Sequence, residues 1–226
     1  MKNYLIHSRP DLVRLINIFR YELTSRWAVW SRRLTGGGWN VARRFRGAEK
    51  LRLNLASGGM IIPGWLSVDV GRDADVRADL RDRIPLNDNS VTLIFCEHFA
   101  DHLAFPAGIR RFLSECHRVL ELGGRVRFVL HDAEGLLKAY VAKDATYFEV
   151  AQEVFPTMME SVNKLFRFNG FHLFLYDFET FQKALLEAGF SAIERRNYLD
   201  SDIPELILDF KHPSREIMSM YVEALK

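Results

Sequence analysis

The chain has 226 residues, of which 48% are hydrophobic, and a formal net charge of +2. This length suits one α/β domain with an appendage and leaves little room for a second full domain. No apolar run approaches the roughly 18 residues that a membrane span needs, and the first residues lack the features of a secretory signal. The two cysteines, Cys96 and Cys116, lie in apolar stretches and are expected to be buried and reduced. Together these features favour a soluble, cytoplasmic protein.

Positive charge is concentrated at the start of the chain. Residues 1–50 hold eleven Lys or Arg and three acids, a net charge of +8, whereas residues 51–226 hold 20 and 26, a net charge of −6. We therefore divide the chain into a basic N-terminal arm, residues 1–50, and an acidic body, residues 51–226. The arm would attract phosphates, but the sequence has no RNA-binding module, zinc knuckle or base-stacking pattern, so a nucleic-acid partner is not expected.

Apolar residues recur at steps of three and four between residues 10 and 34, which predicts an amphipathic helix in the arm. Ser8 is placed to cap this helix, and three glycines at 36–38 would end it in a hinge. Three roles are open: a helix packed on the body, a basic lid over a substrate that carries phosphate or carboxylate, or contact with a membrane surface. The apolar positions are Leu12, Leu15, Ile16, Phe19, Leu23, Trp27, Trp30 and Leu34.

Residues 51–69 have the pattern of a ligand-binding turn between two strands. Leucines alternate along 51–55 as in a strand, small residues follow at 57–59, and a second short strand at 66–68 ends in Asp69. In parallel α/β proteins such a turn lets the backbone approach a nucleoside, and the acid that follows accepts hydrogen bonds from ribose hydroxyls. The alternative is an ordinary turn between two buried strands.

The rest of the body alternates strands with helices. An unbroken apolar run at 91–96 is typical of a central parallel strand, and polar residues follow it directly, at the edge where open α/β sheets bind ligands. Helices are predicted at 107–120, where Gly123 and Gly124 would end the helix, at 134–141, at 145–166 with an interruption at Pro156, and from a cap at Asp177 to 188. Further strands are predicted at 75–80, 125–130, 190–195 and 218–225.

Seven short motifs follow one another along the body: Leu53–Gly58, Pro63–Asp69, Ala78–Leu80, Ile84–Val91, Glu97–His98, Arg118–Gly124 and Glu187–Phe190. In this order they resemble the class I S-adenosylmethionine-dependent methyltransferases, in particular a branch of the methyltransferase type 11 kind. The resemblance covers residues 51–226 and implies a three-layer Rossmann-like α/β fold, with strand order 3-2-1-4-5-7-6 and an antiparallel last strand. Residues 134–171 would then be a helical insertion above the sheet.

The resemblance also implies where S-adenosyl-L-methionine would bind. The first motif and the turn after it would border the methionine moiety, Asp69 would accept from the ribose, Asp79 and Leu80 would flank the adenine, and Glu97 would face the sulfonium. The cofactor-binding residues are therefore expected to be Asn54, Ala56, Ser57, Gly58, Gly59, Asp69, Asp79, Leu80 and Glu97.

Three residues depart from the family's pattern. Asn54 stands where the family usually has an acid, and Ala56 and Met60 stand where it has glycines. An amide cannot offset the positive amino group of the cofactor, and side chains in place of glycines restrict how closely the backbone approaches it. The alternative to an enzyme is therefore a degenerate methyltransferase fold that acts as a non-catalytic binding or scaffold module.

Three histidines are candidates for a general base: His98, His102 and His131, each at or just beyond the end of a predicted strand. Methyl transfer to a hydroxyl needs a group that accepts the proton, and a neutral histidine suits this at pH 7. His98 is the first choice because it follows the central strand most closely. The alternative is that each histidine is structural.

The spacing of His98, Asp101 and His102 would place three metal ligands on one face if that segment is helical. However, the chain has no cysteine pair and no His-Glu-x-x-His pattern nearby, so no metal is expected. The predicted function is methyl transfer, at oxygen, to a small-molecule or sugar-like acceptor that carries negative charge or hydroxyls. Loops and insertions bind the acceptor in this fold, and here they contain no motif that would identify it.

Overall fold

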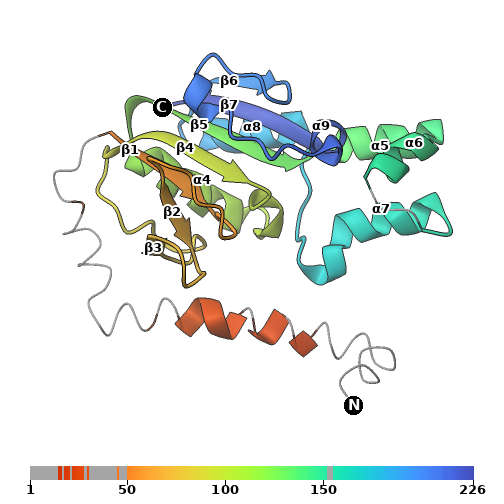
Figure 1. Ribbon diagram of the computed structural model, residues 1–226, viewed down its shortest axis with the longest axis horizontal. Helices are drawn as coiled ribbons and strands as arrows, with labels where there is room; N and C mark the ends of the chain where they lie inside the picture. Colours follow the sequence, from red (N-terminus) through yellow and green to blue (C-terminus); the bar gives the residue numbers. More distant parts are fainter. Residues whose placement is uncertain are drawn as a thin grey trace.

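A seven-stranded sheet in the order β3-β2-β1-β4-β5-β7-β6 forms the centre of the molecule, as predicted (Figure 1). The computed structural model describes residues 15, 16, 18–20, 22–27, 30, 45, 50–151 and 155–226. The predicted cap at Ser8, the hinge at 36–38 and both ends of the predicted helix over 10–34 lie outside the described residues. The strands are β1 (Leu51–Leu55), β2 (Leu66–Asp69), β3 (Val76–Arg77), β4 (Val91–Glu97), β5 (Leu120–His131), β6 (Ser191–Arg196) and β7 (Ser219–Leu225).

Strands β1 to β5 pair in parallel, so their carboxyl ends meet at one edge of the sheet. Strand β1 lies between β2 and β4, and Leu53 is opposite both Leu66 and Ile94. Strand β7 is antiparallel and lies between β5 and β6, where Phe128 is opposite Val222. This arrangement brings the residues after β1, β2, β4 and β5 together at the ligand-binding edge.

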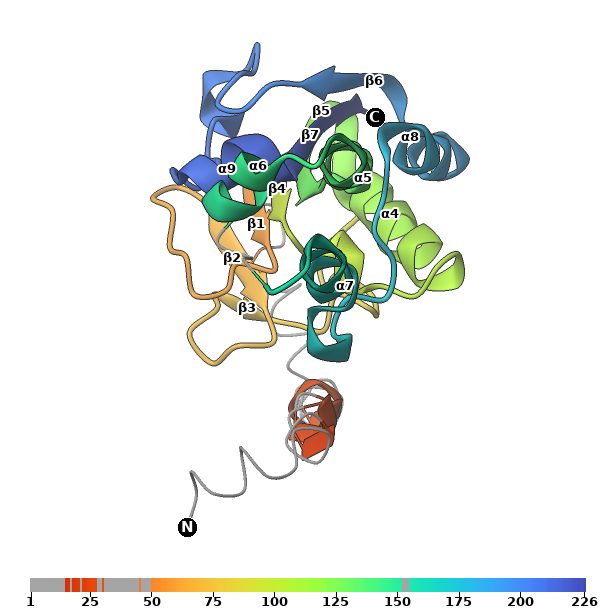
Figure 2. The same ribbon diagram turned by 90° about the vertical axis from the view of Figure 1, so that its right-hand side faces the viewer.

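The alternation of side chains along β4 divides the interior into two layers. Ile94 and Cys96 face the main apolar core, which packs against α4 (Ala107–Val119) and α8 (Phe178–Glu187). Phe95 faces the opposite layer, a smaller apolar cluster that includes Trp65 and residues of η3 (Pro204–Leu206). Figure 2 shows α4 and α8 together on one side of the sheet and α9 (Pro213–Met218) on the other. Both cysteines are buried and free, as expected.

Helices α5 (Ala133–Ala142), α6 (Ala145–Val150) and α7 (Met158–Arg167) extend from the carboxyl edge of the sheet and have an apolar cluster of their own (Figure 1). Each begins at a side chain that accepts a backbone hydrogen bond: Asp132, Asp144 and Thr157 respectively. Two short 3-10 turns, η1 (Ala100–His102) and η2 (Phe168–Gly170), lie between this group and the sheet. None of the described helices is long and apolar enough to cross a membrane.

Two predicted boundaries are wrong. Gly123 and Gly124 do not end α4, which stops at Val119, but lie within β5, where the pairing with β4 shifts register. A Cβ at Gly124 would lie 2.9 Å from the carbonyl oxygen of Glu121, so a glycine is required for close packing there and not for a helix end. The third strand is also shorter than predicted, because only residues 76–77 pair with β2.

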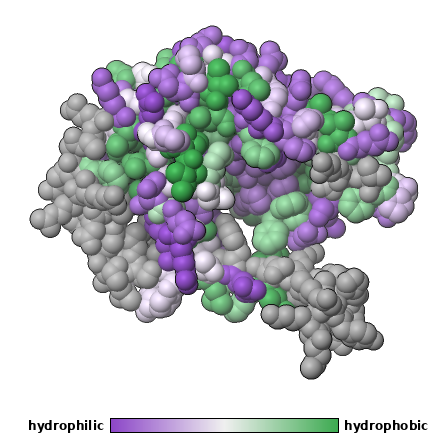
Figure 3. Space-filling view, in the orientation of Figure 1, coloured by the Kyte–Doolittle hydropathy of each residue, from purple (hydrophilic) through white to green (hydrophobic). Residues whose placement is uncertain are grey.

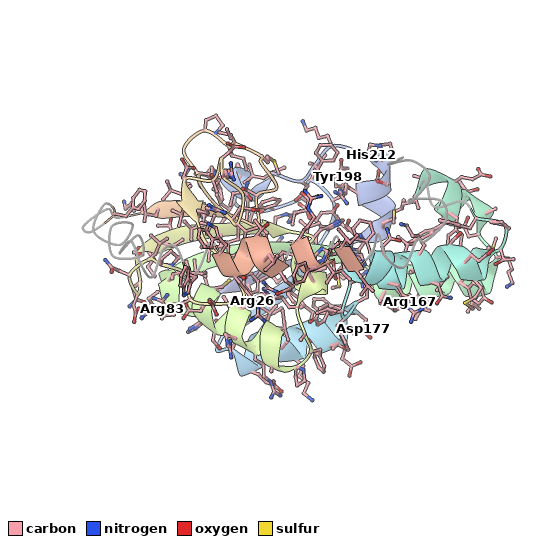
Figure 4. The ribbon with its side chains drawn as sticks, turned by 90° about the horizontal axis from the view of Figure 1, so that it is seen from below. Arg26, Arg83, Arg167, Asp177, Tyr198 and His212 are labelled. Atoms are coloured by element: carbon pink, nitrogen blue, oxygen red, sulfur yellow. The ribbon has the colours of Figure 1, made fainter. Side chains whose placement is uncertain are left out.

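The described part of the arm, residues 15–30 with gaps, is helical and lies outside the layers of the body, beneath β3 and α7 in both ribbon views (Figures 1 and 2). Glu22 of this segment pairs with Arg81 of the body at 2.5 Å. Arg26, labelled in the view from below, belongs to the same segment (Figure 4). The large apolar side chains of this segment are about half exposed: Leu15, Ile16, Phe19, Leu23, Trp27 and Trp30. Figure 3 shows hydrophobic surface at the lower edge of the molecule.

Candidate functional site

The turn after β1 is held to the end of β2 by one carboxylate. Asp69 accepts hydrogen bonds from the backbone N–H of Gly58, at 3.0 Å, and of Gly71, at 2.8 Å. Gly58 and Gly59 both have positive φ, a conformation that costs glycine nothing. The carboxylate oxygens each keep a further lone pair, so Asp69 can still accept hydrogen bonds from a ligand.

Each of the three residues that depart from the family pattern has a defined contact or conformation in this turn. Asn54 is buried and donates from Nδ2 to the carbonyl oxygen of Met60 at 3.2 Å, which closes the turn from within. The side chain of Met60 packs against the apolar cluster around Trp65. Ala56 has φ of 52°, so a residue with a Cβ occupies a conformation that favours glycine, at a cost of about 1 kcal/mol.

A cavity of about 210 Å³ lies beside this turn at the carboxyl ends of β1, β2 and β4. Six predicted site residues line it, and four further residues complete its wall. The predicted lining residues are Ala56, Asp69, Asp79, Leu80, His98 and His102, and the others are Val70, Ala78, Phe99 and Phe171.

Two larger cavities share walls with this one. A cavity of about 730 Å³ shares Asp79 with it and is bounded on its other side by Trp27 and Trp30 of the arm. A cavity of about 340 Å³ shares Phe99, His102 and Phe171 with it. Arg81, Arg111 and Glu22 line both of the larger cavities.

Asp79 is tied into a chain of charged groups that reaches the arm. Its carboxylate accepts two hydrogen bonds from the guanidinium of Arg81, and Nη1 of Arg81 donates to Glu22 at 2.5 Å. These acids raise the pKa of Arg81 further above its ordinary value, with Asp79 the largest cause. The arm is therefore connected to the wall of the 210 Å³ cavity by one arginine.

Both ring nitrogens of His98 have partners. Arg215 of α9 donates from Nη1 to Nδ1 at 2.7 Å, and Nε2 lies 3.0 Å from Ser219 Oγ. Because an arginine only donates, Nδ1 is the acceptor and Nε2 carries the hydrogen. Burial, followed by the nearby His131 and Arg215, lowers the pKa of His98 well below its ordinary value. Arg215 also pairs with Glu97 at 3.0 Å, so the end of β4 is held by α9.

The His102 ring has a backbone acceptor at Phe171, and the backbone of His98 also lies within reach of the ring. Its Nδ1 lies 3.0 Å from the carbonyl oxygen of Phe171, an acceptor, so Nδ1 carries the hydrogen and Nε2 holds a lone pair. Burial lowers the pKa of His102, which favours the neutral ring. His102 lines both the 210 Å³ cavity and the 340 Å³ cavity.

His131 belongs to a more deeply buried group. Its Nδ1 lies 2.8 Å from Oδ2 of Asp101, a carboxylate with no exposed surface. Its ring centroid is 4.0 Å from that of His98 and 4.8 Å from that of His172, and His172 is 5.1 Å from His102. Four of the seven histidines of the chain thus form one connected cluster at the carboxyl edge of the sheet.

Not every predicted site residue lines the 210 Å³ cavity. Asn54, Ser57, Gly58 and Gly59 belong to the turn beside it, Glu97 pairs with α9, and His131 lies behind His98. Sequence reasoning missed the roles of Phe171 and Arg215, because these residues lie far along the chain in segments without a motif.

Comparison with known proteins gives one family match. Residues 66–128 match the model of a methyltransferase domain. No match was found among curated protein sequences. Similar solved structures include S-adenosylmethionine-dependent methyltransferases from Thermotoga maritima (18% identity, 94% of this chain and 97% of that one covered, TM-score 0.49), Archaeoglobus fulgidus (16%, 88% and 99%, 0.47) and Mesorhizobium loti (17%, 79% and 92%, 0.48). At such TM-scores the class of protein rests on the strand order and the family match.

Proposed function

We propose that this chain is a class I S-adenosylmethionine-dependent methyltransferase that methylates a hydroxyl oxygen of a small acceptor that is sugar-like or negatively charged. The strand order and the methyltransferase-domain match give the class of enzyme. The acceptor and the oxygen target are our inference from the side chains around the 340 Å³ cavity. One observation carries it: His102 forms part of the wall between this cavity and the 210 Å³ cavity at the cofactor motifs.

The residues around the 210 Å³ cavity fit S-adenosyl-L-methionine. Asp69 keeps lone pairs for ribose hydroxyls, and Ala56, which has positive φ, lines the cavity with no more than a methyl side chain. Ala78 and Leu80 provide an apolar wall near Asp79 that suits a flat base. When bound, the cofactor supplies an electrophilic methyl group.

The protein's own side chains must hold the acceptor oxygen in line, exclude water and accept the proton that the hydroxyl loses. Phe99 and Phe171 form apolar parts of the wall that His102 shares between the two cavities. Arg111 faces the 340 Å³ cavity and suits an acceptor with a carboxylate, a phosphate or several hydroxyls.

Among the three candidate bases, the hydrogen bonds favour His102. His98, the first choice from sequence, carries its hydrogen on Nε2 and has Nδ1 occupied by Arg215. His131 does not line the 210 Å³ cavity. His102 lines both cavities and leaves Nε2 with a lone pair. We therefore propose that this atom accepts the proton that the acceptor hydroxyl loses.

Replacing Asp69 by Ala is expected to weaken binding of the cofactor or its demethylated product by roughly 1.5 to 3 kcal/mol, about 10- to 150-fold, because a charged acceptor is lost. Calorimetric titration of the full chain measures it. Asp73→Ala is the matched control, since Asp73 is an exposed acid four residues further along. Equal affinities for the two variants would argue against our placement of the ribose. No binding to the wild-type chain at millimolar ligand would favour the non-catalytic scaffold instead.

The acceptor class can be tested separately. Formation of the demethylated cofactor is measured with panels of sugars, sugar phosphates and hydroxylated carboxylates, and with amines of matched size. We expect turnover with hydroxyl-bearing, anionic acceptors. Turnover only with amines would contradict methylation at oxygen while leaving the enzyme class intact.

A further inference from the structure

Asp101, His131 and His172 come from three separate segments, η1, the end of β5 and the chain after η2, yet one ligand atom of each lies within 4.8 Å of the others. All three are largely buried: Asp101 has no exposed surface, His172 is 7% exposed, and the side chain of His131 is 15% exposed. No step in the proposed methyl transfer uses them. A buried carboxylate between two imidazoles therefore needs another explanation.

The carboxylate of Asp101 is only half satisfied. Oδ2 is bonded to the His131 ring at 2.8 Å and lies 3.4 Å from the His131 backbone nitrogen, whereas Oδ1, also buried, has no hydrogen-bond partner among the described residues. In the described part of the chain no arginine or lysine pairs with this carboxylate. Leaving such an oxygen without a partner costs roughly 1–3 kcal/mol, and a buried charge usually has a countercharge or a metal beside it.

His172 is held as a metal ligand by its own hydrogen bond. Nδ1 of His172 lies 2.6 Å from the carbonyl oxygen of Leu165, so it carries the hydrogen and leaves Nε2 as a ligand atom. Nδ1 of His131 lies 2.8 Å from Oδ2 of Asp101, so a metal held by these two atoms would take the place of the hydrogen between them. Metal-binding histidines commonly donate their second N–H to a carbonyl or a carboxylate, which fixes the ring and its tautomer.

We propose that Asp101, His131 and His172 bind one divalent transition-metal cation of the zinc type. Two imidazoles and one carboxylate suit Zn²⁺, whereas Mg²⁺ and Ca²⁺ prefer oxygen ligands alone. Ligand atoms about 2.1 Å from a tetrahedral metal lie about 3.4 Å apart, so ligand atoms now up to 4.8 Å apart would close by about 1.4 Å, whereas His131 Nδ1 and Asp101 Oδ2, now 2.8 Å apart, would separate slightly. The fourth position is open to water.

The cation would join the helical insertion to the sheet. His172 follows α7 and η2, Asp101 follows β4, and His131 ends β5, so one ion would bridge the insertion to the ends of two neighbouring strands. The cation site does not depend on which acceptor the enzyme methylates, and the experiment that tests it does not measure methyl transfer. The spacing that the sequence offered for a metal involved His98, Asp101 and His102, and only Asp101 of these three belongs to the cluster.

The test uses the full chain without an affinity tag, treated with chelator and dialysed. Titration with ZnCl₂, followed by calorimetry and elemental analysis, is expected to give one equivalent of zinc, and saturation at about 100 times Kd is expected to raise Tm by roughly 5–10 °C. Co²⁺ at the same site should give the visible absorption of a low-symmetry nitrogen and oxygen site, which a merely structural histidine would not produce. Mg²⁺ should neither bind nor compete.

His172→Ala and Asp101→Asn are each expected to weaken zinc binding by about 100-fold or more, since loss of supporting groups alone costs 10- to 100-fold. His117→Ala, at a histidine on α4 outside the cluster, is the control and should bind zinc like the wild type. A folded wild-type chain that binds no stoichiometric Zn²⁺ or Co²⁺ would overturn the proposal, and Asp101 and His131 would then be a simple hydrogen-bonded pair. Binding that survives both cluster variants would also overturn it.

Discussion

Replacement of Arg127 by methionine is expected to lower the free energy of unfolding by about 3–5 kcal/mol, a large fraction of the total stability of an ordinary domain. Arg127 lies on β5 with no exposed surface, and all five of its N–H groups have acceptors. Two are paired with Asp209 at 2.8 and 2.6 Å and one with Glu223 at 2.8 Å. Methionine fills a similar space but leaves Asp209 without its cation and Glu223 with only the more distant Arg196, at 3.8 Å.

Chemical denaturation measures the effect, with Arg110→Met as a control. Arg110 forms an ion pair with Glu187 on the surface, so its loss should cost no more than about 1 kcal/mol. Combining Arg127→Met with Asp209→Asn and Glu223→Gln should recover part of the loss, because the unpaired charges disappear. If Arg127→Met costs as little as Arg110→Met, the two carboxylates are not held as buried ions.

Replacement of His102 by Ala or Gln is expected to reduce kcat by about 100-fold or more, the usual contribution of a positioned general base. Neither residue can accept a proton at neutral pH, whereas Gln keeps a polar group that can bond to the carbonyl of Phe171. Because His102 shares the cavity wall without a direct role in holding the ribose, cofactor affinity should change by less than about threefold. Formation of demethylated cofactor under saturating acceptor measures kcat, and calorimetry measures the affinity.

The matched comparison is His98→Gln. His98 donates to Ser219 and accepts from Arg215, so we expect its replacement to disturb the end of β4 and the cofactor affinity more than the proton transfer. A large fall in kcat for His98→Gln together with an unchanged kcat for His102→Gln would reverse the assignment. Equal falls in both, with cofactor affinity intact, would mean that the two rings act together.

The fold could be predicted because its signals are local. The alternation at 51–55, the glycines that follow and the acid at Asp69 lie within nineteen residues, and the structure joins them by the hydrogen bonds of Asp69. Strand order followed from the resemblance and is confirmed. The cofactor side of the candidate site could be predicted for the same reason, since it is built from strand ends and the turns beside them.

The other side of the site could not be predicted because its contacts join residues far apart in the chain. Arg215 reaches His98 from α9, and His172 reaches Asp101 from beyond α7. Neither partner has a sequence signal, since a lone arginine or histidine is compatible with many surroundings. The prediction that the glycines at 123–124 end a helix was wrong for a different reason. A glycine needed for close packing within a strand has the same sequence signature as a glycine that ends a helix.

The place of β7 in the sheet has a consequence for protein synthesis. Strands β1 to β5 leave the ribosome in an order that lets each pair with one already made, but β6 has no partner until β7, the last strand to be made, inserts between it and β5. Until then the β5 edge is unpaired, and Arg127 lacks Glu223. An open edge beside a buried charge is prone to wrong pairing and aggregation. Nascent chains stalled before Ser219 should therefore depend on chaperones far more than chains stalled after Leu225 has emerged.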